Sequence, residues 1–589
     1  MSASLAPVDA APTPVEPSPP QLERRTAWLL IGVGALAVCA LYVFGARAFP
    51  LSDPDESRYG EIAREMLIRH DWVTPNLNYV KYFEKPPLVY WATALGFAGL
   101  GVGDFVARLP VVLSGLATVA LTVWLAADMY GASTAVLVLP TLALGPLFAI
   151  LAFVLTLDMS LTLFMTLAMV SVWFAWSATP LGDSGRRGGM PAAMASQRLS
   201  RVAGCGPRAW YRVAYVATAL AILVKGPVAA VLVGAIALLF LVLHGGWRAV
   251  RPALDWRGAL LAVLVALPWF VLVSWRNPEF VHFFVVDQHL ARYLWTHEHG
   301  EPIWFYLPLI PVSLGPWTLM LVFDPPLVRA ALAPRTWTVP TRFLVIWTAA
   351  IIVFFSLSTS KLGTYILPAM PPLAVLVARA IELGVARGRT VGISRIAWCL
   401  LIVGPIVSLC GAVLPMVIDH WRMPIIAPIL FAGGPVLLIS GWLVLRVLRG
   451  GRPYAALAAL AFGWCVALGV AVNGRAAEND YHSLGVAARA AMQPGDRLAM
   501  YNHYTPGIPY YSEHRTIMVG LVGELKFGSE HGADPAYFWH LDDLRREWAA
   551  PGRLFLVINR VELDAFNPSL QPPPIVLASK DEKVLVTNR

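Results

Sequence analysis

Charged residues are scarce in this chain of 589 residues: they make up 14% of the sequence, whereas hydrophobic residues make up 57%. With a mean hydropathy of +0.63, this composition excludes a single water-soluble domain that hides its apolar side chains in a core. The hydrophobic residues instead occur in long runs, which are typical of membrane-spanning helices. The sequence therefore predicts an α-helical polytopic membrane protein.

Cysteine is also rare: the chain has five, and none follows residue 474. This usage excludes a disulfide scaffold. The net charge of +9 would suit a nucleic-acid partner, but most of the basic residues lie in short loops between apolar runs. In such loops they act as topology signals, so we expect no nucleic-acid partner.

About thirteen apolar runs are of roughly bilayer-spanning length. The first lacks a small-residue cleavage site, so we expect an anchor that follows a cytoplasmic disordered tail, 1–26. A transmembrane part is expected at 27–473, with a first periplasmic loop at 50–108, and a soluble part at 474–589. The runs lie at 27–49, 109–127, 132–150, 158–178, 210–224, 227–243, 258–275, 303–323, 343–358, 364–385, 396–418, 424–445 and 454–473.

Arginine predicts the orientation of these runs. If the amino terminus is cytoplasmic, the arginine clusters between the runs all fall on the cytoplasmic side, as the positive-inside rule requires. Lysine behaves differently, because every lysine before residue 526 falls on the external side. A negatively charged ligand on that face is one explanation, and for Lys225 alone anchoring to lipid head groups is an equal alternative. These lysines are Lys81, Lys85, Lys225 and Lys361.

The segment 474–589 has a different pattern, in which short β-rich runs alternate with helix-like stretches. It is expected to be a small soluble α/β domain on the external side. The predicted strands are Arg497 to Tyr501, Thr516 to Val519, Leu554 to Asn559 and Ile575 to Ala578, and the predicted helices include Ser483 to Met492 and His540 to Trp548.

The densest group of ionisable and aromatic side chains lies directly after the first apolar run, in DPDESRYGEIAREMLIRHDWVTPNLNYVKYFEKPPLVYW, residues 53–91. Asp53, Pro54 and Glu56 predict the start of a helix with a capping box, and this helix is expected to reach about His70. By their spacing, three side chains share one of its faces: Asp55, Arg58 and Tyr59. They are either surface charges on an interfacial helix or part of a site.

The second half of that stretch favours a site. Tyr82, Glu84 and Lys85 precede two prolines, which bias the backbone away from helix and hold a stiff turn. Asp158 lies where the fourth run begins, and a carboxylate there is costly unless it is paired or functional. The motif TSKLGTYILP places Lys361 and Tyr365 just before the tenth run. Since Lys and Arg can neutralise a phosphate, these groups predict an external site for an anionic lipid.

These motifs resemble those of a known family. PDESRYGEIAREML, the following DW, YFEKPPLVYW, Asp158 and SKLGTYILP are similar to motifs of integral-membrane glycosyltransferases that use polyprenyl-phosphate sugars. The similarity is greatest to bacterial 4-amino-4-deoxy-L-arabinose transferases, which modify lipid A, and weaker to protein O-mannosyltransferases. It covers nearly the whole membrane part.

The resemblance implies a glycosyltransferase C fold in the bacterial inner membrane. Its active site would face the periplasm, in a cavity that the soluble domain closes. It implies that a monomer transfers the amino sugar from undecaprenyl phosphate to lipid A phosphates. This transfer would lower the surface negative charge and give polymyxin resistance. The catalytic residues that it implies are Asp55, Asp158 and Lys85. The substrate contacts that it implies are Arg58, Tyr59, Tyr82, Glu84, Arg292, Lys361 and Tyr365.

The role of Asp55 depends on the acceptor. A lipid A phosphate has a second pKa of about 6 and is largely deprotonated at neutral pH, so it needs no general base. Asp55 would then orient the acceptor, pair with the sugar amine or stabilise positive charge on the sugar ring. A protein hydroxyl as acceptor would need Asp55 as its base. Lys85, with Arg292 or Lys361, would stabilise the leaving undecaprenyl phosphate.

No cofactor is required by this chemistry, although Glu84, His297 and His299 could bind zinc if their loops meet. The alternatives are a glycosyltransferase that resembles protein O-mannosyltransferases and, in a different class, a lipid or solute transporter. Charges inside a membrane and many spans also suit a transporter. The ionisable residues, however, cluster at one face and not at the midplane.

Overall fold

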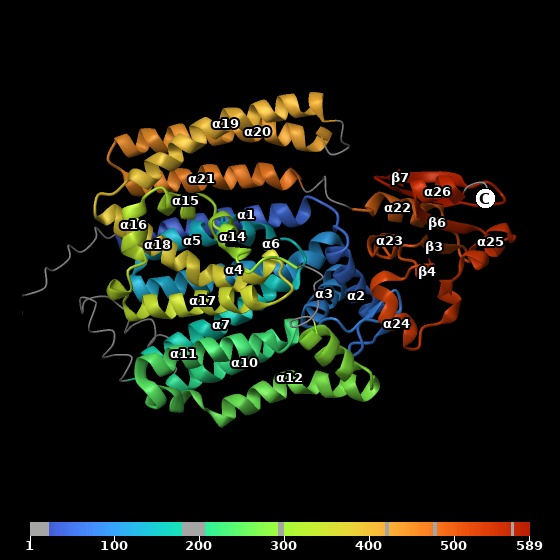
Figure 1. The fold of residues 1–589 in the computed structure, drawn as a ribbon, viewed down its shortest axis with the longest axis horizontal. Coiled ribbons are helices and arrows are strands. Elements are labelled where there is room, and N and C mark those ends of the chain that lie inside the picture. The colour runs from blue at the N-terminus through green and yellow to red at the C-terminus, as the bar shows by residue number, and fades with distance from the viewer. Residues whose placement is uncertain (1–22, 180–205, 292–299, 419–422, 475–479, 567–569) are drawn as a thin grey trace, which may run out of the picture.

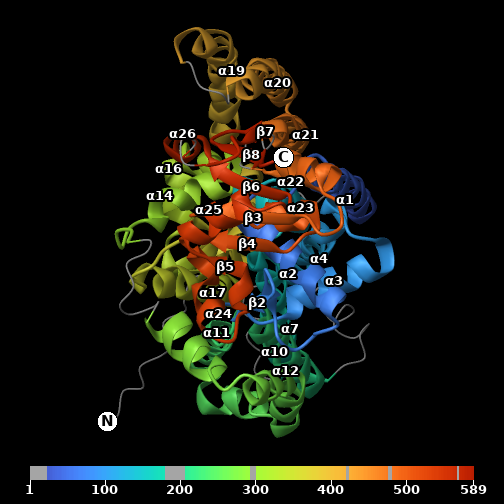
Figure 2. The same cartoon turned by 90° about the vertical axis from the view of Figure 1, so that its right-hand side faces the viewer.

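The computed structural model consists of a body of long helices lying side by side, with a small sheet-containing domain at one end of it (Figure 1). Turned by 90°, the small domain covers the end of the body, while α19 and α20 stand out to one side as a pair (Figure 2). The structure describes residues 23–179, 206–291, 300–418, 423–474, 480–566 and 570–589.

Ten helices among the described residues are long and apolar enough to cross a membrane, so the chain is a multi-pass membrane protein. They are α1 (Arg24–Arg47), α4 (Asp104–Tyr130), α7 (Leu157–Ser177), α11 with η1 (Val228–Ala253), α12 (Trp256–Arg276), α17 (Val339–Leu357), η4 with α18 (Gly363–Ala386), α19 (Val391–Val417), α20 (Met423–Arg449) and α21 (Pro453–Val472).

Three of the predicted runs are not among these ten helices, so the count of about thirteen spans is not confirmed. One of them is the less apolar helix α10 (Pro207–Lys225). The other two are interrupted, each at a Leu-Gly-Pro sequence. The first forms α5 (Ala132–Ala143) and α6 (Pro146–Leu151), and the second forms α14 (Tyr306–Ser313) and α15 (Pro316–Val322).

The two interrupted runs cross each other at their breaks. Gly145 lies so close to the second run that a Cβ there would be 2.9 Å from the carbonyl oxygen of Ser313. Gly315 has a φ of +59° and lies against Pro146, so the second break also favours glycine. The indole of Trp464 donates a hydrogen bond of 2.9 Å to the Leu144 carbonyl, which the break releases from the helix ladder.

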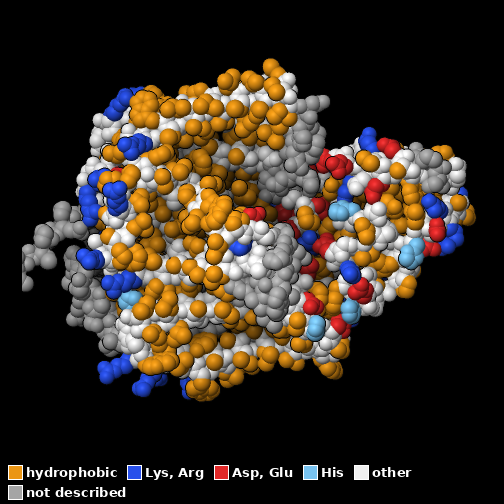
Figure 3. Space-filling view, viewed as in Figure 1, with side chains coloured by type: hydrophobic (Ala, Val, Ile, Leu, Met, Phe, Trp, Pro, Cys, Tyr) orange, Lys and Arg blue, Asp and Glu red, His pale blue; other side chains and the backbone are white. Residues whose placement is uncertain are grey.

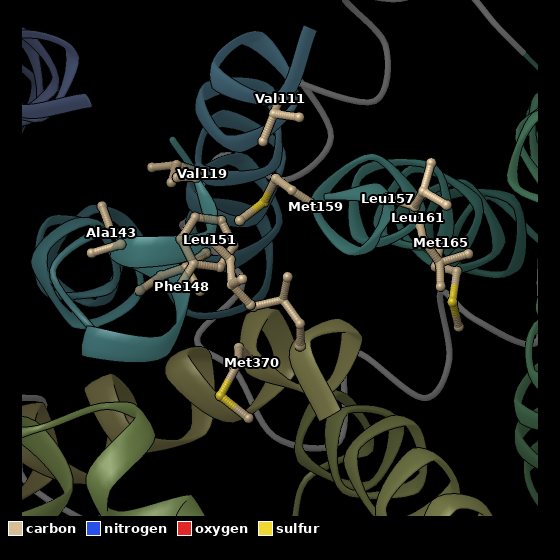
Figure 4. Close-up of a cluster of buried hydrophobic side chains, with 14 of the residues drawn as sticks. Val111, Val119, Ala143, Phe148, Leu151, Leu157, Met159, Leu161, Met165 and Met370 are labelled. Atoms are coloured by element: carbon tan, nitrogen blue, oxygen red, sulfur yellow. The ribbon is translucent and has the colours of Figure 1, made fainter. Parts of the chain in front are cut away.

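The core of the body lies where α4, α5, α6 and α7 meet the segment that begins α18. Val111, Phe148, Met159 and Met370 come from four of these elements and point toward one another (Figure 4). All four are buried. This packing fixes the start of α7 against α4, α6 and the start of α18.

Lys and Arg side chains gather at the end of the body that points away from the small domain, while acidic, basic and histidine side chains mix at the other end (Figure 3). The band between the two ends is hydrophobic. This asymmetry is the one expected from the distribution of arginine along the sequence.

The small domain contains a six-stranded sheet in the order β5-β4-β3-β6-β8-β7. Strands β5, β4, β3 and β6 are parallel to one another, and β8 is antiparallel to both of its neighbours, β6 and β7. Three predicted strands have the observed bounds, and β5 and β8 were not predicted. The strands are β3 (Arg497–Tyr501), β4 (Thr516–Val519), β5 (Phe538–Trp539), β6 (Leu554–Asn559), β7 (Ile575–Lys580) and β8 (Lys583–Thr587). The helices are α22 (His482–Ala491), α23 (Gly507–Ser512), η6 (Gly523–Leu525), α24 (Lys526–Glu530), η7 (Pro535–Tyr537), α25 (Leu541–Ala549) and α26 (Arg560–Phe566).

The first loop folds into α2 (Asp55–Arg69), a two-stranded hairpin and α3 (Leu88–Leu100). Helix α2 ends at His70, which is left-handed, so the predicted helix is confirmed. The predicted capping box is wrong: the helix has no side-chain cap. The hairpin strands are β1 (Asn76–Leu77) and β2 (Val80–Lys81), and the remaining short helices are η2 (His282–Ala291), α16 (Pro325–Ala331) and η3 (Pro334–Thr336).

The small domain is held against the first loop by buried hydrogen bonds. The Asn78 amide donates to the Thr516 carbonyl and accepts from the Thr516 backbone N–H, both at 2.9 Å. Asp53, which was expected to cap α2, accepts from the Gly507 N–H at 2.9 Å instead. The domain and the loop therefore form one structural unit above the membrane body.

Candidate active site

A charged cluster, formed by Asp55, Arg58, Glu84 and Glu524, lies where α2 meets the small domain. Arg58 Nη1 is 3.1 Å from Asp55 Oδ1, and Arg58 Nε is 2.5 Å from Glu524 Oε2. The Asp55 side chain is 59% exposed, whereas those of Arg58 and Glu524 are mostly covered. The small domain thus contributes a carboxylate to a cluster that begins on the membrane side.

Burial raises the pKa of Glu524 to about 7, against the opposing effect of Arg58. The carboxylates of Glu84 and Asp55 raise it further, which shows that the acids of the charged cluster act on one another. The Arg58 guanidinium therefore forms ion pairs with two carboxylates, Asp55 and Glu524, that repel each other. Groups in this condition are typical of functional sites.

Three tyrosines lie beneath the charged cluster. The rings of Tyr59 and Tyr90 are 5.8 Å apart. The hydroxyls of Tyr82 and Tyr90 are buried and have no hydrogen-bond partner among the described residues. Burial raises the pKa of Tyr82, and the Glu84 carboxylate beside it raises that pKa further. Buried hydroxyls normally find a partner, so these two are available to a ligand.

A second group lies at the start of α7, where Asp158 forms an ion pair with Lys225 at the end of α10. The Lys225 amine also lies over the ring of Tyr365, 4.7 Å from its centre. Burial raises the pKa of Tyr59, and the carboxylates that add to this effect include both Asp55 and Asp158. Tyr59 therefore connects the charged cluster with the Asp158–Lys225 pair.

The external lysines have different surroundings. Lys361 is buried, and its amine donates to the carbonyls of Glu301, at 2.8 Å, and Ser358, at 2.6 Å. It braces the segment before α18. Lys85 is half-buried on the bend between Glu84 and α3. Lys81 forms an ion pair of 2.5 Å with Glu279.

Two family models match this chain: dolichyl-phosphate-mannose-protein mannosyltransferase over residues 27–284, and aminoarabinose transferase C-terminal domain over residues 484–588. Among curated relatives, an undecaprenyl phosphate-alpha-4-amino-4-deoxy-L-arabinose arabinosyl transferase of Pseudomonas fluorescens is 30% identical over 444 residues, 74% of this chain and 73% of the relative. The chain belongs to the aminoarabinose transferase family. A second relative, from another strain of that species, is 32% identical, and the alignment spans 68% of this chain and 64% of the relative.

The crystal structure of ArnT from Cupriavidus metallidurans bound to undecaprenyl phosphate has the same fold, with a TM-score of 0.79 and 27% identity over 96% of this chain and 99% of that chain. Its apo state gives a TM-score of 0.77. The resemblance and the glycosyltransferase C fold expected from the sequence motifs are therefore confirmed.

Several predicted site residues come together in this family member. The charged cluster contains the predicted residues Asp55, Arg58 and Glu84. Tyr59 and Tyr82 lie beside it, and the Asp158 group lies beyond Tyr59. Arg292, His297 and His299 lie outside the described residues. The described part of the chain contains no group of three or more His, Cys, Asp or Glu that could hold a metal, so zinc at Glu84 stays a prediction.

Two residues of the site were not among the predicted site residues. Lys225 drew notice only as an external lysine, and its partner Asp158 is 67 positions away. Glu524 has no marker in the sequence, because it lies in the soluble domain while its partner Arg58 lies in the first loop. A search for acids in the soluble domain facing the arginine of the first loop would have been needed to find it.

Proposed function

We propose that this chain is a glycosyltransferase that moves 4-amino-4-deoxy-L-arabinose from undecaprenyl phosphate to lipid A phosphate groups. Family membership and the ArnT relative bound to undecaprenyl phosphate support the donor. The observation that carries the proposal is the charged cluster, which combines a guanidinium with carboxylates where the membrane body meets the small domain. Addition of an amino sugar would lower the negative charge of the cell surface and so make the cell resistant to polymyxin.

The proposed face is the periplasmic side of the inner membrane. The arginine-rich end of the body lies away from the small domain, which supports a cytoplasmic position for that end. A lipid-linked donor suits the opposite face, because its phosphate leaving group stores the energy that transfer needs. The acceptor phosphate needs no base, since its second pKa is about 6.

Each catalytic residue has a proposed role. Lys85 stabilises the charge that grows on undecaprenyl phosphate as the sugar leaves. Asp55, exposed at the edge of the cluster, orients the acceptor or stabilises positive charge on the sugar ring. Asp158 holds Lys225 above Tyr365, so these residues form the floor against which the donor phosphate lies.

The test is mass spectrometry of lipid A from a strain that lacks its own aminoarabinose transferase and carries this gene. Wild-type protein is expected to add one aminopentose to lipid A phosphates, and Asp55→Asn is expected to add none. Unmodified lipid A with the wild-type gene would contradict the proposal.

Transfer to a protein hydroxyl is the second candidate, because the mannosyltransferase model matches the region with the first loop and Asp158. In that case Asp55 acts as general base. Glycoproteins from the same cells distinguish the two: altered glycoproteins with unchanged lipid A would favour this candidate. A transporter would change neither, and purified protein would transfer no sugar in detergent.

A further inference from the structure

The charged cluster contains more acid than a site for a phosphate requires. Among the described residues, it has three carboxyl groups, Asp55, Glu84 and Glu524, and one guanidinium, Arg58. Because carboxylates bind cations, a positive group on the ligand suits this surrounding.

The contact between Arg58 and Glu524 leaves bonding capacity unused. The two groups are 2.5 Å apart, yet Arg58 Nε has no hydrogen-bond partner, so the contact is an ion pair without hydrogen-bond geometry. Glu524 accepts no hydrogen bond from any residue in the described part of the chain. The Tyr82 hydroxyl, 3% exposed and beside the same charges, is also without a partner. A ligand with several N–H donors would supply hydrogen bonds to the Glu524 carboxylate and to the Tyr82 hydroxyl oxygen.

Glu524 is held in place by the packing of the short helix that follows it. Phe527 lies 5.8 Å from Phe83 and 4.0 Å from Phe283, ring centre to ring centre. Gly528 lies so close to the hairpin that a Cβ there would be 2.6 Å from the Lys81 carbonyl oxygen. Since Phe83 immediately precedes Glu84, one aromatic contact positions both acids.

We propose that Glu524 is a specificity-determining residue that binds the ammonium group of the amino sugar on the donor lipid, an inference that rests on the proposed function. The ammonium has three N–H donors and one positive charge. It can therefore donate hydrogen bonds to the Glu524 carboxylate and the Tyr82 hydroxyl oxygen and place a positive charge beside the acids. The small domain thus selects amino sugars over neutral sugars.

The experiment compares two donors with purified full-length protein and lipid A: undecaprenyl phosphate carrying the free amino sugar, and the same lipid with the amine acetylated. Wild-type protein is expected to prefer the free amine. Glu524→Gln keeps the shape but loses the charge, so its kcat/KM for the free amine should fall about tenfold or more, mainly through KM. Its kcat/KM for the acetylated donor should stay the same or rise.

Two variants control for structure. Glu513→Gln removes another ion pair of the small domain, 2.6 Å from Arg489, and should leave both donors unaffected. Glu524→Asp keeps the charge and should retain the preference for the amine. Hydrogen exchange at the Thr516 amide, which Asn78 protects, reports whether the domain stays docked.

An equal loss for both donors in Glu524→Gln would overturn the inference, because it would show that Glu524 only ties the domain to the loop. An unchanged preference would also overturn it. If Glu524→Gln undocks the domain, Glu524→Asp decides the matter by keeping or losing the preference. Failure of the proposed function looks different, since wild-type protein would then transfer neither sugar to lipid A.

Discussion

The acid–arginine pairs on the two faces of helix α2 differ in their hydrogen bonding and in their exposure. On the buried face, Glu56 binds Arg108 through two hydrogen bonds of 2.7 and 2.8 Å and also accepts from the Leu155 backbone N–H. Arg108 donates further bonds to backbone carbonyls at the end of α1 and just after it, those of Ala46, Phe49 and Pro50. On the open face, Arg58 meets Asp55 and Glu524 with fewer bonds and more exposure.

The difference separates a structural pair from a functional one. A buried pair with every group satisfied has nothing left for a ligand, and it fixes the first span, α2 and α7 to one another. A pair that is partly bonded and partly exposed can rearrange when a substrate arrives. Residues two positions apart on one helix therefore serve different purposes.

The largest effect is expected from breaking the buried pair. Arg108→Met leaves the Glu56 carboxylate buried without its partner, which should cost about 3–5 kcal/mol of stability. The thermal unfolding temperature of the purified protein measures this loss. Arg58→Met is the matched control on the open face and should reduce activity while changing the unfolding temperature little. Equal shifts for both variants would contradict the comparison.

Asp55→Asn tests the open face by chemistry. The carboxylate is exposed, so its loss should not alter folding, but transfer should fall about 100-fold or more. Single-turnover transfer of the sugar to lipid A measures the rate. Transfer at the wild-type rate would place the chemistry elsewhere.

Lys85→Ala should also abolish most transfer, by about 100-fold, because the leaving phosphate loses its counter-charge. The protein is expected to remain folded. Binding of undecaprenyl phosphate, followed by tryptophan fluorescence, should weaken in the variant. Unchanged binding and activity would remove this lysine from the mechanism.

Asn78→Ala weakens the contact that closes the open face. It removes the hydrogen bonds to the Thr516 backbone, so docking of the small domain should lose about 1–3 kcal/mol. Faster hydrogen exchange in β4 measures this loss. Asn473→Ala is the control, because among the described residues that side chain bonds only carbonyls of its own helix. Equal exchange in the two variants would mean that other contacts hold the domain.

The smallest effect is a pH dependence of docking. Burial raises the pKa of Asp53 to about 7, although the Gly507 N–H, Lys583 and Arg58 lower it; Asp480 raises it further. An acid whose pKa is higher in the docked state favours docking fully below about pH 4, and this contribution is lost progressively as the pH rises to about 7. Exchange of the Gly507 amide, corrected for its intrinsic rate, should show this trend. Asp53→Asn should remove it, and a trend that persists in the variant would implicate other acids.

Local patterns in the sequence predicted the local structure well. The helix α2 and the strands β3, β4 and β6 follow from spacing and residue type, because their stabilising contacts lie within a few positions or in a regular sheet. The interrupted spans were missed, since a hydropathy window averages over the break. Leu-Gly-Pro at each break was the available signal.

Contacts between distant parts of the chain could not be predicted. Asp53 and Glu56 have the right spacing for a capping box, but their partners Gly507 and Arg108 lie 454 and 52 positions away and bind them more strongly. Motif resemblance supplied the first-loop residues of the site. It did not supply Glu524, because that acid enters the site only through the packing of the small domain.

The crossing of the two interrupted runs constrains the order in which the protein can be assembled. When residues 132–151 first enter the bilayer, the freed Leu144 carbonyl has no partner, because Trp464 is 320 positions further along the chain. Such a segment is poorly tolerated by lipid alone. We therefore expect this break to reach its final packing only after α21 has been synthesised.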